Sequence, residues 1–332
     1  MKKYFFVLGA CIMLGSCSTG DAAMSAMMSG GSSQALTFLG SRAISEEEIE
    51  FVFSQPVTIQ SLSFAPELSV ALVENGSTVR VWLEERHEPG TLITVDMLAE
   101  DEKKNSINVL TTLRSRNNRM PELAINELCT EYANAAAGRK AEFIEFKMMS
   151  DGNLGAMRVF IIGNSNAAKQ TIYEFSPVEV QKDDYVVLHL RTYDPASVDE
   201  YGSDLAESGG MNSSAAARDF WIPGTTKLLH KTAMIYVMDQ DDHILNAVMI
   251  SENPNLPWPK DYFAETAGLL FEQGAWNGGP VSSAGTTNTR TICRDETLKD
   301  ISSSNADWYI TVTSGATPGD INNTRRYQAP GS

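Results

Sequence analysis

Short segments in which apolar and polar residues alternate recur through most of the chain from residue 35 onward. Residues 123–129 and 142–146 are two such segments, and each alternates apolar with polar or acidic positions. A period of two is typical of β-strands that bury one face. Turn sequences separate these segments, for example Glu-Asn-Gly-Ser at residues 74–77. The pattern therefore predicts an all-β protein.

A charged and polar linker at residues 114–119 separates two strand-rich regions. The chain has 332 residues, which exceeds the usual size of one domain, so we expect two domains. We place the first at residues 35–118 and the second at residues 121–324. Short strands that recur at regular spacing predict two antiparallel β-sandwich domains in tandem.

Two long segments without strand periodicity interrupt the second domain, at about residues 193–223 and 252–285. Within the later segment, residues 260–273 have a pattern that predicts one short helix. Aromatic residues in both segments have two interpretations: an exposed platform that binds a protein or glycan partner, or anchors that pin the loops onto the sandwich. The sequence favours anchors, because proline-rich loops need apolar contacts to stay ordered. These residues are Trp221, Trp258, Tyr262, Phe263 and Trp276.

The N-terminus has the composition of an export signal. A short basic start precedes an apolar run at residues 4–14, which is too short to span a bilayer as a permanent helix. The run ends in Leu-Gly-Ser-Cys17, which resembles the lipobox of bacterial lipoproteins. This resemblance implies that residues 1–16 form a signal peptide and that Cys17 carries the lipid. Residues 17–34, rich in Ser and Gly, then predict a flexible tether between lipid and fold.

Several motifs of the second domain resemble, in the correct order, those of lamin-tail-like domains. Ile-Asn-Glu-Leu at residues 125–128 and Glu-Phe-Ile-Glu-Phe at residues 142–146 match the first two strand motifs, and residues 317–322, Thr-Pro-Gly-Asp-Ile-Asn, are similar to the terminal motif. Asp183 and Asp184 depart from the family by replacing its usual glycine. The first domain resembles the Ig-like modules of bacterial surface proteins. Together these resemblances imply Ig-like β-sandwiches without catalytic activity.

The chain is strongly acidic, with a formal net charge of −16. Such a surface repels phosphate backbones and anionic lipid headgroups, so nucleic acid is not an expected partner and membrane attachment should come from the lipid on Cys17. We therefore expect an exported bacterial lipoprotein of the cell envelope. The outer membrane, on its periplasmic or surface face, is favoured over the inner membrane.

Cys129 and Cys293 are the two cysteines of the folded part once Cys17 is acylated. An oxidising compartment permits a disulfide between them, whereas cysteine is also one of the most buried residue types without a partner. The sequence leaves the disulfide and the two free thiols open.

No group of residues in the sequence has the spacing of a catalytic or metal site. Asp239, Asp241 and His243 echo the first half of a calcium loop, but the glycine and the bidentate glutamate of such a loop are missing, so we predict a solvated hairpin turn. Glu127 and Glu145 alternate with apolar neighbours, which a half-exposed strand also requires, and we predict structural or surface roles. We therefore expect no catalytic residues, no metal and no cofactor.

These observations lead to a main hypothesis and two others. The main one is a non-enzymatic envelope lipoprotein whose long loops contact a protein or glycan partner. The alternative is a metal-assisted hydrolase that uses acidic loop residues. A third hypothesis is a cell-wall glycan binder.

Overall fold

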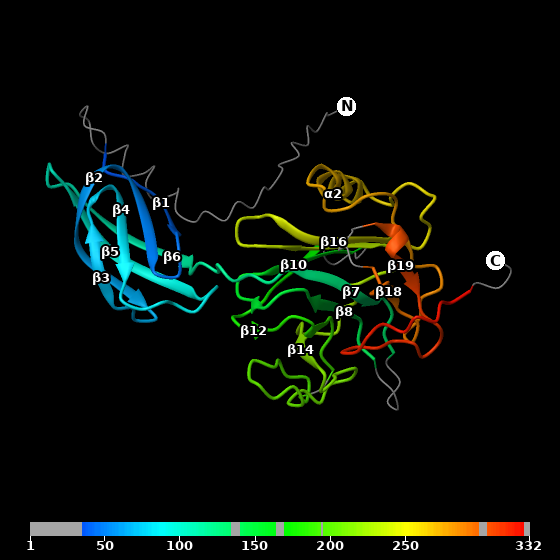
Figure 1. Cartoon of the computed structure of the whole chain (residues 1–332). Helices are drawn as coiled ribbons and strands as arrows, with labels where there is room; N and C mark the ends of the chain where they lie inside the picture. The colour runs from blue at the N-terminus through cyan, green and yellow to red at the C-terminus, as the bar shows by residue number, and fades with distance from the viewer. Residues whose placement is uncertain (1–34, 134–139, 164–168, 194, 299–303, 329–332) are drawn as a thin grey trace, which may run out of the picture. The chain divides into compact units, whose positions relative to one another are not determined.

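The computed structural model describes residues 35–133, 140–163, 169–193, 195–298 and 304–328. Strands dominate these ranges, which confirms the predicted all-β fold class (Figure 1). The predicted signal peptide, Cys17 and the whole predicted tether lie outside the described residues. Among the described residues, no helix has both the length and the apolar composition that a membrane crossing requires.

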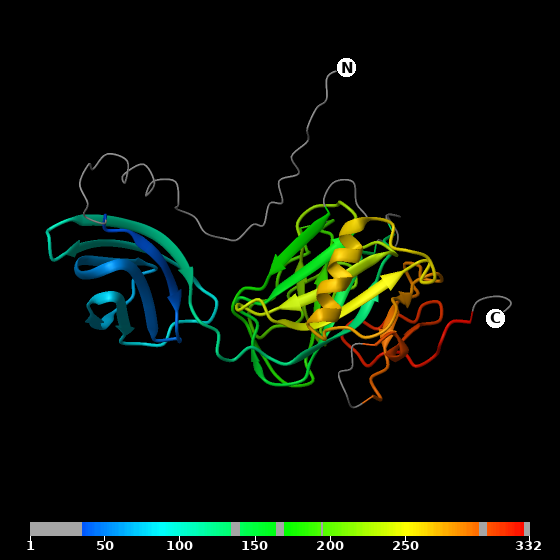
Figure 2. The same ribbon diagram turned by 90° about the horizontal axis from the view of Figure 1, so that it is seen from above.

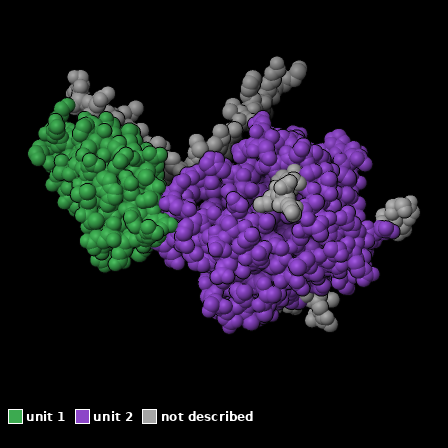
Figure 3. Space-filling model, viewed as in Figure 1, with its two compact units in different colours: residues 1–87, 92–114 green, residues 88–91, 115–332 purple. Residues whose placement is uncertain are grey.

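The chain divides into two compact units, coloured separately in Figure 3. The first unit contains Met1–His87 and Leu92–Arg114, and the second contains Glu88–Thr91 and Ser115–Ser332. The division falls at the start of the predicted linker. The short stretch Glu88–Thr91 joins the second unit through Gly90, whose amide donates to the Ser115 carbonyl at 3.1 Å. Gly90 has a φ of +74° and lies against the backbone of Gly155 and Ala156, where a Cβ would be 2.5 Å from the Ala156 nitrogen.

The first unit is built on one long, bent strand rather than on two separate sheets. Strand β2 has 18 residues; its first half pairs with β1 and β4, and its second half pairs with β5, with register irregularities between the halves. All pairs are antiparallel, and the sheet order is β3-β4-β2-β5-β6 with β1 on β2. Side chains from both arms of the bent sheet share one core, which includes Phe51, Val81 and Met97. Figure 2 shows the curvature. The strands are β1 (Phe38–Ala43), β2 (Glu48–Ala65), β3 (Val70–Glu74), β4 (Gly76–Leu83), β5 (Leu92–Asp101) and β6 (Ser106–Arg114).

The second unit contains a five-stranded sheet, β11-β10-β15-β16-β17, and a six-stranded sheet, β14-β13-β8-β7-β18-β19. A small β12-β9 pair completes it. The strands are β7 (Leu123–Cys129), β8 (Phe143–Met148), β9 (Gly152–Asn153), β10 (Arg158–Gly163), β11 (Gln170–Glu174), β12 (Glu179–Val180), β13 (Tyr185–His189), β14 (Ala217–Trp221), β15 (Ala233–Met238), β16 (Ile244–Ser251), β17 (Val281–Ser282), β18 (Ile292–Arg294) and β19 (Trp308–Ile310).

Two strand pairs depart from the predicted antiparallel arrangement. Strand β14 pairs in parallel with β13, and β17 pairs in parallel with β16. Both β14 and β17 lie in the predicted insertions at about residues 193–223 and 252–285. A long connection is what parallel pairing requires, because the chain must cross over before it returns in the same direction. The insertions therefore extend the sheets as parallel neighbours.

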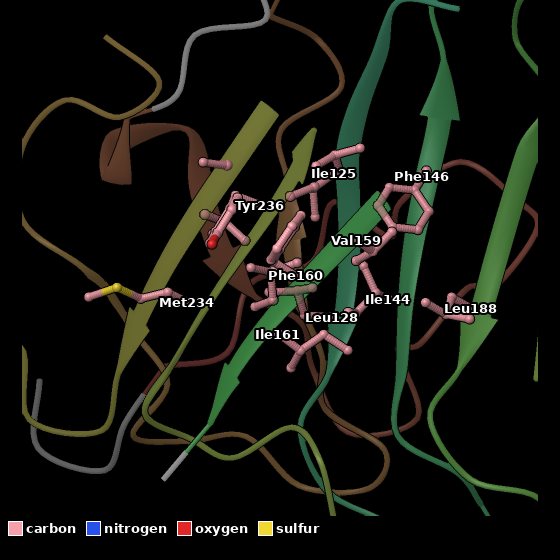
Figure 4. Packing of buried hydrophobic residues seen from close by; sticks show 14 of the residues in the cluster. Ile125, Leu128, Ile144, Phe146, Val159, Phe160, Ile161, Leu188, Met234 and Tyr236 are labelled. Carbon is pink, nitrogen blue, oxygen red and sulfur yellow. The ribbon is translucent and has the colours of Figure 1, made fainter. Parts of the chain in front are cut away.

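The two sheets share a large apolar core (Figure 4). Ile144, Phe146 and Leu188 of the six-stranded sheet lie in one cluster with Val159 and Ile161 of the five-stranded sheet. This arrangement agrees with the predicted sandwich. The rings of Phe146 and Phe175 meet edge to face, with centroids 6.1 Å apart.

The predicted helix is α2 (Asp261–Glu272), which packs on β15 and β16. Its buried residues are Phe263, Ala267 and Leu270, at positions i, i+4 and i+7, which share one face of a helix. Figure 2 shows the helix lying across the five-stranded sheet.

Candidate functional site

Three of the sequence motifs meet on the face of the six-stranded sheet that points away from the five-stranded sheet. Glu127 on β7 and Glu145 on β8 project there, and both side chains are fully buried, at 0% exposure. The sequence predicted a half-exposed strand at these positions, and that prediction was wrong. Residues 311–328, which we call the C-terminal segment, cover this face and exclude water from it.

The carboxylates hold the C-terminal segment by its backbone. The amide of Thr317 donates to Glu127 at 3.1 Å, and the amide of Gly319 donates to Glu145 at 2.7 Å. A third carboxylate, the partly buried Glu296, accepts the amide of Asn322 at 2.8 Å. These hydrogen bonds satisfy backbone donors and carboxyl oxygens that would otherwise be buried without partners.

Side chains from neighbouring strands complete this carboxylate cluster. Glu127 also accepts the hydroxyl of Thr291, and Glu145 accepts the side-chain amide of Asn126 at 2.8 Å. The side-chain amide of Asn322 donates to the carbonyls of Asn126, at 3.1 Å, and Arg294, at 3.0 Å. The three motifs that carry the lamin-tail resemblance thus contribute to one polar network.

The backbone conformation and close packing of Gly319 explain why the terminal motif contains a glycine. Its φ is +81°, a conformation that side chains disfavour. A Cβ at this position would lie 2.5 Å from the Ser214 hydroxyl oxygen and 3.0 Å from the Ala217 Cβ. The segment can approach the sheet and donate to Glu145 only because this position has no side chain.

Burial raises the pKa of Glu127, although the hydrogen bonds from Thr291 and Thr317 partly offset it. Burial also raises the pKa of Glu145 well above its ordinary value, and the nearby charge of Glu127 raises it further. Burial acts to raise the pKa of Glu296 as well, but the hydrogen bonds from Lys147, Asn322 and Asn126 together lower it. The cluster can therefore retain protons on Glu127 and Glu145 at a pH where exposed carboxylates are ionised.

The acidic turn between β15 and β16 brings Asp239, Asp241 and His243 together, with ligand atoms within 4.8 Å of one another. One Asp239 oxygen accepts the amides of Asp241, at 2.8 Å, and His243, at 2.9 Å, while the other lies 3.0 Å from the His243 ring nitrogen Nδ1. Asp241 forms a bidentate pair with Arg116, at 2.6 and 2.5 Å. These carboxylates stabilise the turn, in agreement with the predicted hairpin.

Both cysteines of the second unit are free and buried, so the disulfide alternative does not form. In the register of β7 and β18, Cys293 lies opposite Glu127, and Cys129 is two residues further along β7. Diagonal neighbours are about 7–8 Å apart between Cα atoms, beyond the usual reach of a disulfide. Burial raises the pKa of Cys129 to about 12 and the pKa of Cys293 well above its ordinary value.

The aromatic residues of the insertions anchor the loops, and the exposed platform does not form. Phe263, Trp276 and Trp221 are buried. The indole of Trp276 donates to the Gly279 carbonyl at 3.1 Å. Trp258 is half-buried and stacks on Phe263 with centroids 5.6 Å apart, and the hydroxyl of Tyr262 donates to a backbone carbonyl at 3.1 Å.

A buried histidine–aspartate pair, which the sequence did not indicate, joins the parallel strands β13 and β14. His189 Nε2 lies 2.7 Å from an Asp219 oxygen, and neither side chain is exposed. Burial lowers the pKa of His189, although Asp219 opposes this effect. Trp221, whose indole donates to Ser208 at 3.0 Å, stacks on the His189 ring with centroids 3.8 Å apart. The pair therefore ties the insertion strand to the sheet.

A groove of about 470 Å³ lies where the later insertion meets the end of the chain. Three aromatic residues line it, Trp308 and Tyr309 of β19 and Tyr327 of the C-terminal segment, together with Asn255 and Arg326. The sequence predicted function in the later insertion but did not indicate these aromatic residues, because they lie in short segments without periodicity.

Polar and charged groups surround these rings. The guanidinium of Arg326 lies 4.7 Å from the ring centre of Tyr309 and pairs with Asp295 at 2.9 Å. The guanidinium of Arg290 lies 4.4 Å from the ring centre of Tyr327. Among the described residues, the buried indole Nε1–H of Trp308 has no hydrogen-bond partner. This donor is itself buried, so the groove presents aromatic rings and polar side chains rather than the indole N–H.

Comparisons with known proteins match the second unit to a family. Residues 121–310 match TP_1001_2nd, which is described as a protein second domain. An uncharacterized protein of Treponema pallidum (strain Nichols) is 28% identical over 172 residues, which cover 48% of this chain and 41% of that protein. The chain thus spans less than half the length of this relative.

Two solved structures are similar at a low level. The N-terminal part of the bacterial S-layer protein SbsC gives a TM-score of 0.25 at 14% identity, over 49% of this chain and 46% of that one. A DUF4876 family protein from Bacteroides thetaiotaomicron VPI-5482 gives a TM-score of 0.32 at 11% identity, over 80% of this chain and 84% of that one.

The pKa of Glu145 predicts a pH-dependent difference between the wild type and Glu145→Gln. A carboxyl whose pKa is raised on folding stabilises the folded state below its ordinary pKa of 4.5, and this stabilisation is lost as pH rises through the raised value. We expect the free energy of unfolding of the wild type, relative to the variant, to fall as pH rises above 4.5, by at most about 1.4 kcal/mol per pH unit. Urea denaturation from pH 4.5 to 8 measures this. The matched control is Glu265→Gln, which removes an exposed carboxylate from α2; the same pH dependence in both variants would contradict the assignment.

The free cysteines predict the outcome of a thiol titration. A chain that begins at residue 18 and is kept without reductant should not react with Ellman's reagent when folded, because both thiols are buried. After unfolding in guanidinium chloride, both Cys129 and Cys293 should react. A chain that still shows no thiol when unfolded would contain the disulfide that this structure lacks.

Proposed function

The chain belongs to the TP_1001_2nd family through its second domain, and we propose that it is a non-enzymatic binding module held at a bacterial membrane by a lipid on Cys17. The observation that carries the binding role is the aromatic groove formed by β19, the later insertion and the C-terminal segment. The lipobox-like Leu-Gly-Ser-Cys17 sequence carries the membrane anchor.

The chemistry of the groove suits a glycan. Sugar rings have apolar faces that pack on aromatic side chains, and hydroxyl groups that bond to amide and guanidinium groups. The half-buried Tyr327 supplies aromatic surface beside Trp308 and Tyr309, which are only 8% and 9% exposed, and Asn255 and Arg326 supply the polar groups. A groove of about 470 Å³ has the size of a small-ligand site, and this favours a glycan over a protein partner.

The anchor would place this groove close to other components of the envelope. Two acyl groups hold a protein at a membrane far more firmly than one chain does. Residues 17–34 would act as the flexible tether, which raises the effective concentration of the module near a cell-wall glycan. We propose the outer membrane as its location, and the net charge of −16 supports attachment by lipid rather than by a basic surface.

We also propose that the second unit is a lamin-tail-like domain. The resemblance rested on separate short motifs, and the contacts of Glu127, Glu145 and Gly319 give those motifs a common structural role. A non-enzymatic role is supported by the position of the groups with perturbed pKa values, because Glu127, Glu145 and His189 are buried and bonded within the fold.

The anchor predicts that Cys17 becomes acylated. When the full-length chain is expressed in bacteria fed with an alkyne-tagged palmitate, we expect the mature protein to carry the label. The control is Cys17→Ala, which removes the only acceptor that the lipobox resemblance offers and should abolish both labelling and recovery in the membrane fraction. An unlabelled wild-type chain would contradict the anchor.

The groove predicts glycan binding by a chain that begins at residue 18. On an array of cell-wall glycans, Tyr327→Ala and Asn255→Ala should each weaken binding roughly tenfold, the effect expected when a central contact is lost. The matched control is Tyr201→Ala, because Tyr201 is also exposed, at 54%, but lies outside the groove. Circular dichroism should show that each variant keeps its strand content. A folded wild type that binds no glycan, or binding that survives both groove variants, would refute this proposal.

A further inference from the structure

One wall of the groove belongs to a segment that folds back on itself and then pairs with β19. The amide of Val312 donates to the Arg325 carbonyl at 3.2 Å, and the amide of Tyr327 donates to the Ile310 carbonyl at 2.7 Å. These two bonds close a loop of residues 313–324. Directly after this loop come Arg326 and Tyr327, which line the groove.

The loop is not held by apolar burial. Its buried residues are Gly315, Gly319 and Asn322, none of which has an apolar side chain. The large apolar residue of the loop, Ile321, is 63% exposed. A loop without apolar anchors must gain its order from polar contacts, because fixing its backbone costs conformational entropy.

Those contacts are the hydrogen bonds to the buried carboxylates. Thr317 donates its amide to Glu127, and Gly319 donates its amide to Glu145. Both oxygens of Glu145 are in use, since the other one accepts the side-chain amide of Asn126. A side chain that cannot accept on both sides would leave a buried donor without a partner, which is costly.

The loop is also connected to the groove by a second contact. The hydroxyl of Tyr309, a groove residue on β19, donates to the Asn323 carbonyl at 3.0 Å. Asn323 follows Asn322, whose amide bonds to Glu296. A displacement of the loop therefore removes the hydrogen-bond partner of the Tyr309 hydroxyl. It also shifts the residues that lead into the pairing of Tyr327 with β19.

We propose that Glu127 and Glu145 are positioning residues, which latch the loop of residues 313–324 so that Arg326 and Tyr327 stay in place as the wall of the groove. The importance of this wall for ligand binding rests on the proposed function. The latch itself is a property of the free protein and is measured without ligand.

Amide hydrogen exchange tests the latch. The wild-type chain that begins at residue 18 is compared with its variants Glu127→Gln and Glu145→Gln. Both variants keep the side-chain shape but leave one acceptor oxygen where the carboxyl group has two. We expect exchange at Thr317 and Gly319 to become roughly ten- to a hundredfold faster, and exchange at the Tyr327 amide to rise with it. Amides of β10 and β15 should keep the wild-type rate. The matched control is the exposed Glu265→Gln on α2, which should change none of these rates.

Two results would overturn the proposal. One is no change at Thr317 and Gly319, because the carboxylates would then not hold the loop. The other is faster exchange at these two amides with an unchanged Tyr327, because the loop and the wall would then be independent.

If hydrogen exchange rises throughout the second unit, the variant Gly319→Ala tests the latch instead. This substitution changes the loop itself and leaves Glu127 and Glu145 in place. Its Cβ would lie 2.5 Å from the Ser214 hydroxyl oxygen and would push the loop off the sheet. Faster exchange at Tyr327 with protected β10 amides supports the latch, and any other pattern rejects it. Since no step uses a ligand, a failed latch and a failed glycan array are distinguishable.

Discussion

The arrangement of the second unit depends on hydrogen bonds between backbone amides and buried carboxylates. Burying a carboxylate is unfavourable unless its oxygens are fully bonded. Here the donors that meet this requirement come from the end of the chain, at Thr317, Gly319 and Asn322. The polar face of the sheet thus becomes an interior surface, and β7 is buried at every position.

The long insertions have a related role, since they add layers to a small sandwich. Each returns to the sheets as a short parallel strand, β14 in one case and β17 in the other. Buried aromatic rings fix both returns: Trp221 stacks on His189, and Phe263 and Trp276 enter the main core. The large aromatic side chains of these loops are therefore buried within the fold. A partner would have to contact a different surface.

We propose that this surface is the groove beside β19, to which the later insertion and the C-terminal segment also contribute. Its wall and the carboxylate cluster share the C-terminal segment, so the stability of the fold and the shape of the groove depend on the same few hydrogen bonds.

The sequence by itself determined most strands outside the two insertions, the helix α2, the division near residue 114 and the hairpin turn at Asp239, because each depends on neighbours within a few positions. Only the tertiary structure decided that Glu127 and Glu145 are buried, that Cys129 and Cys293 stay free, and that Trp308 lines a groove. A period of two shows that the faces of a strand differ, but not what covers the polar face. Here the cover lies 190 residues from Glu127 along the chain, and no local pattern reports a contact over that separation.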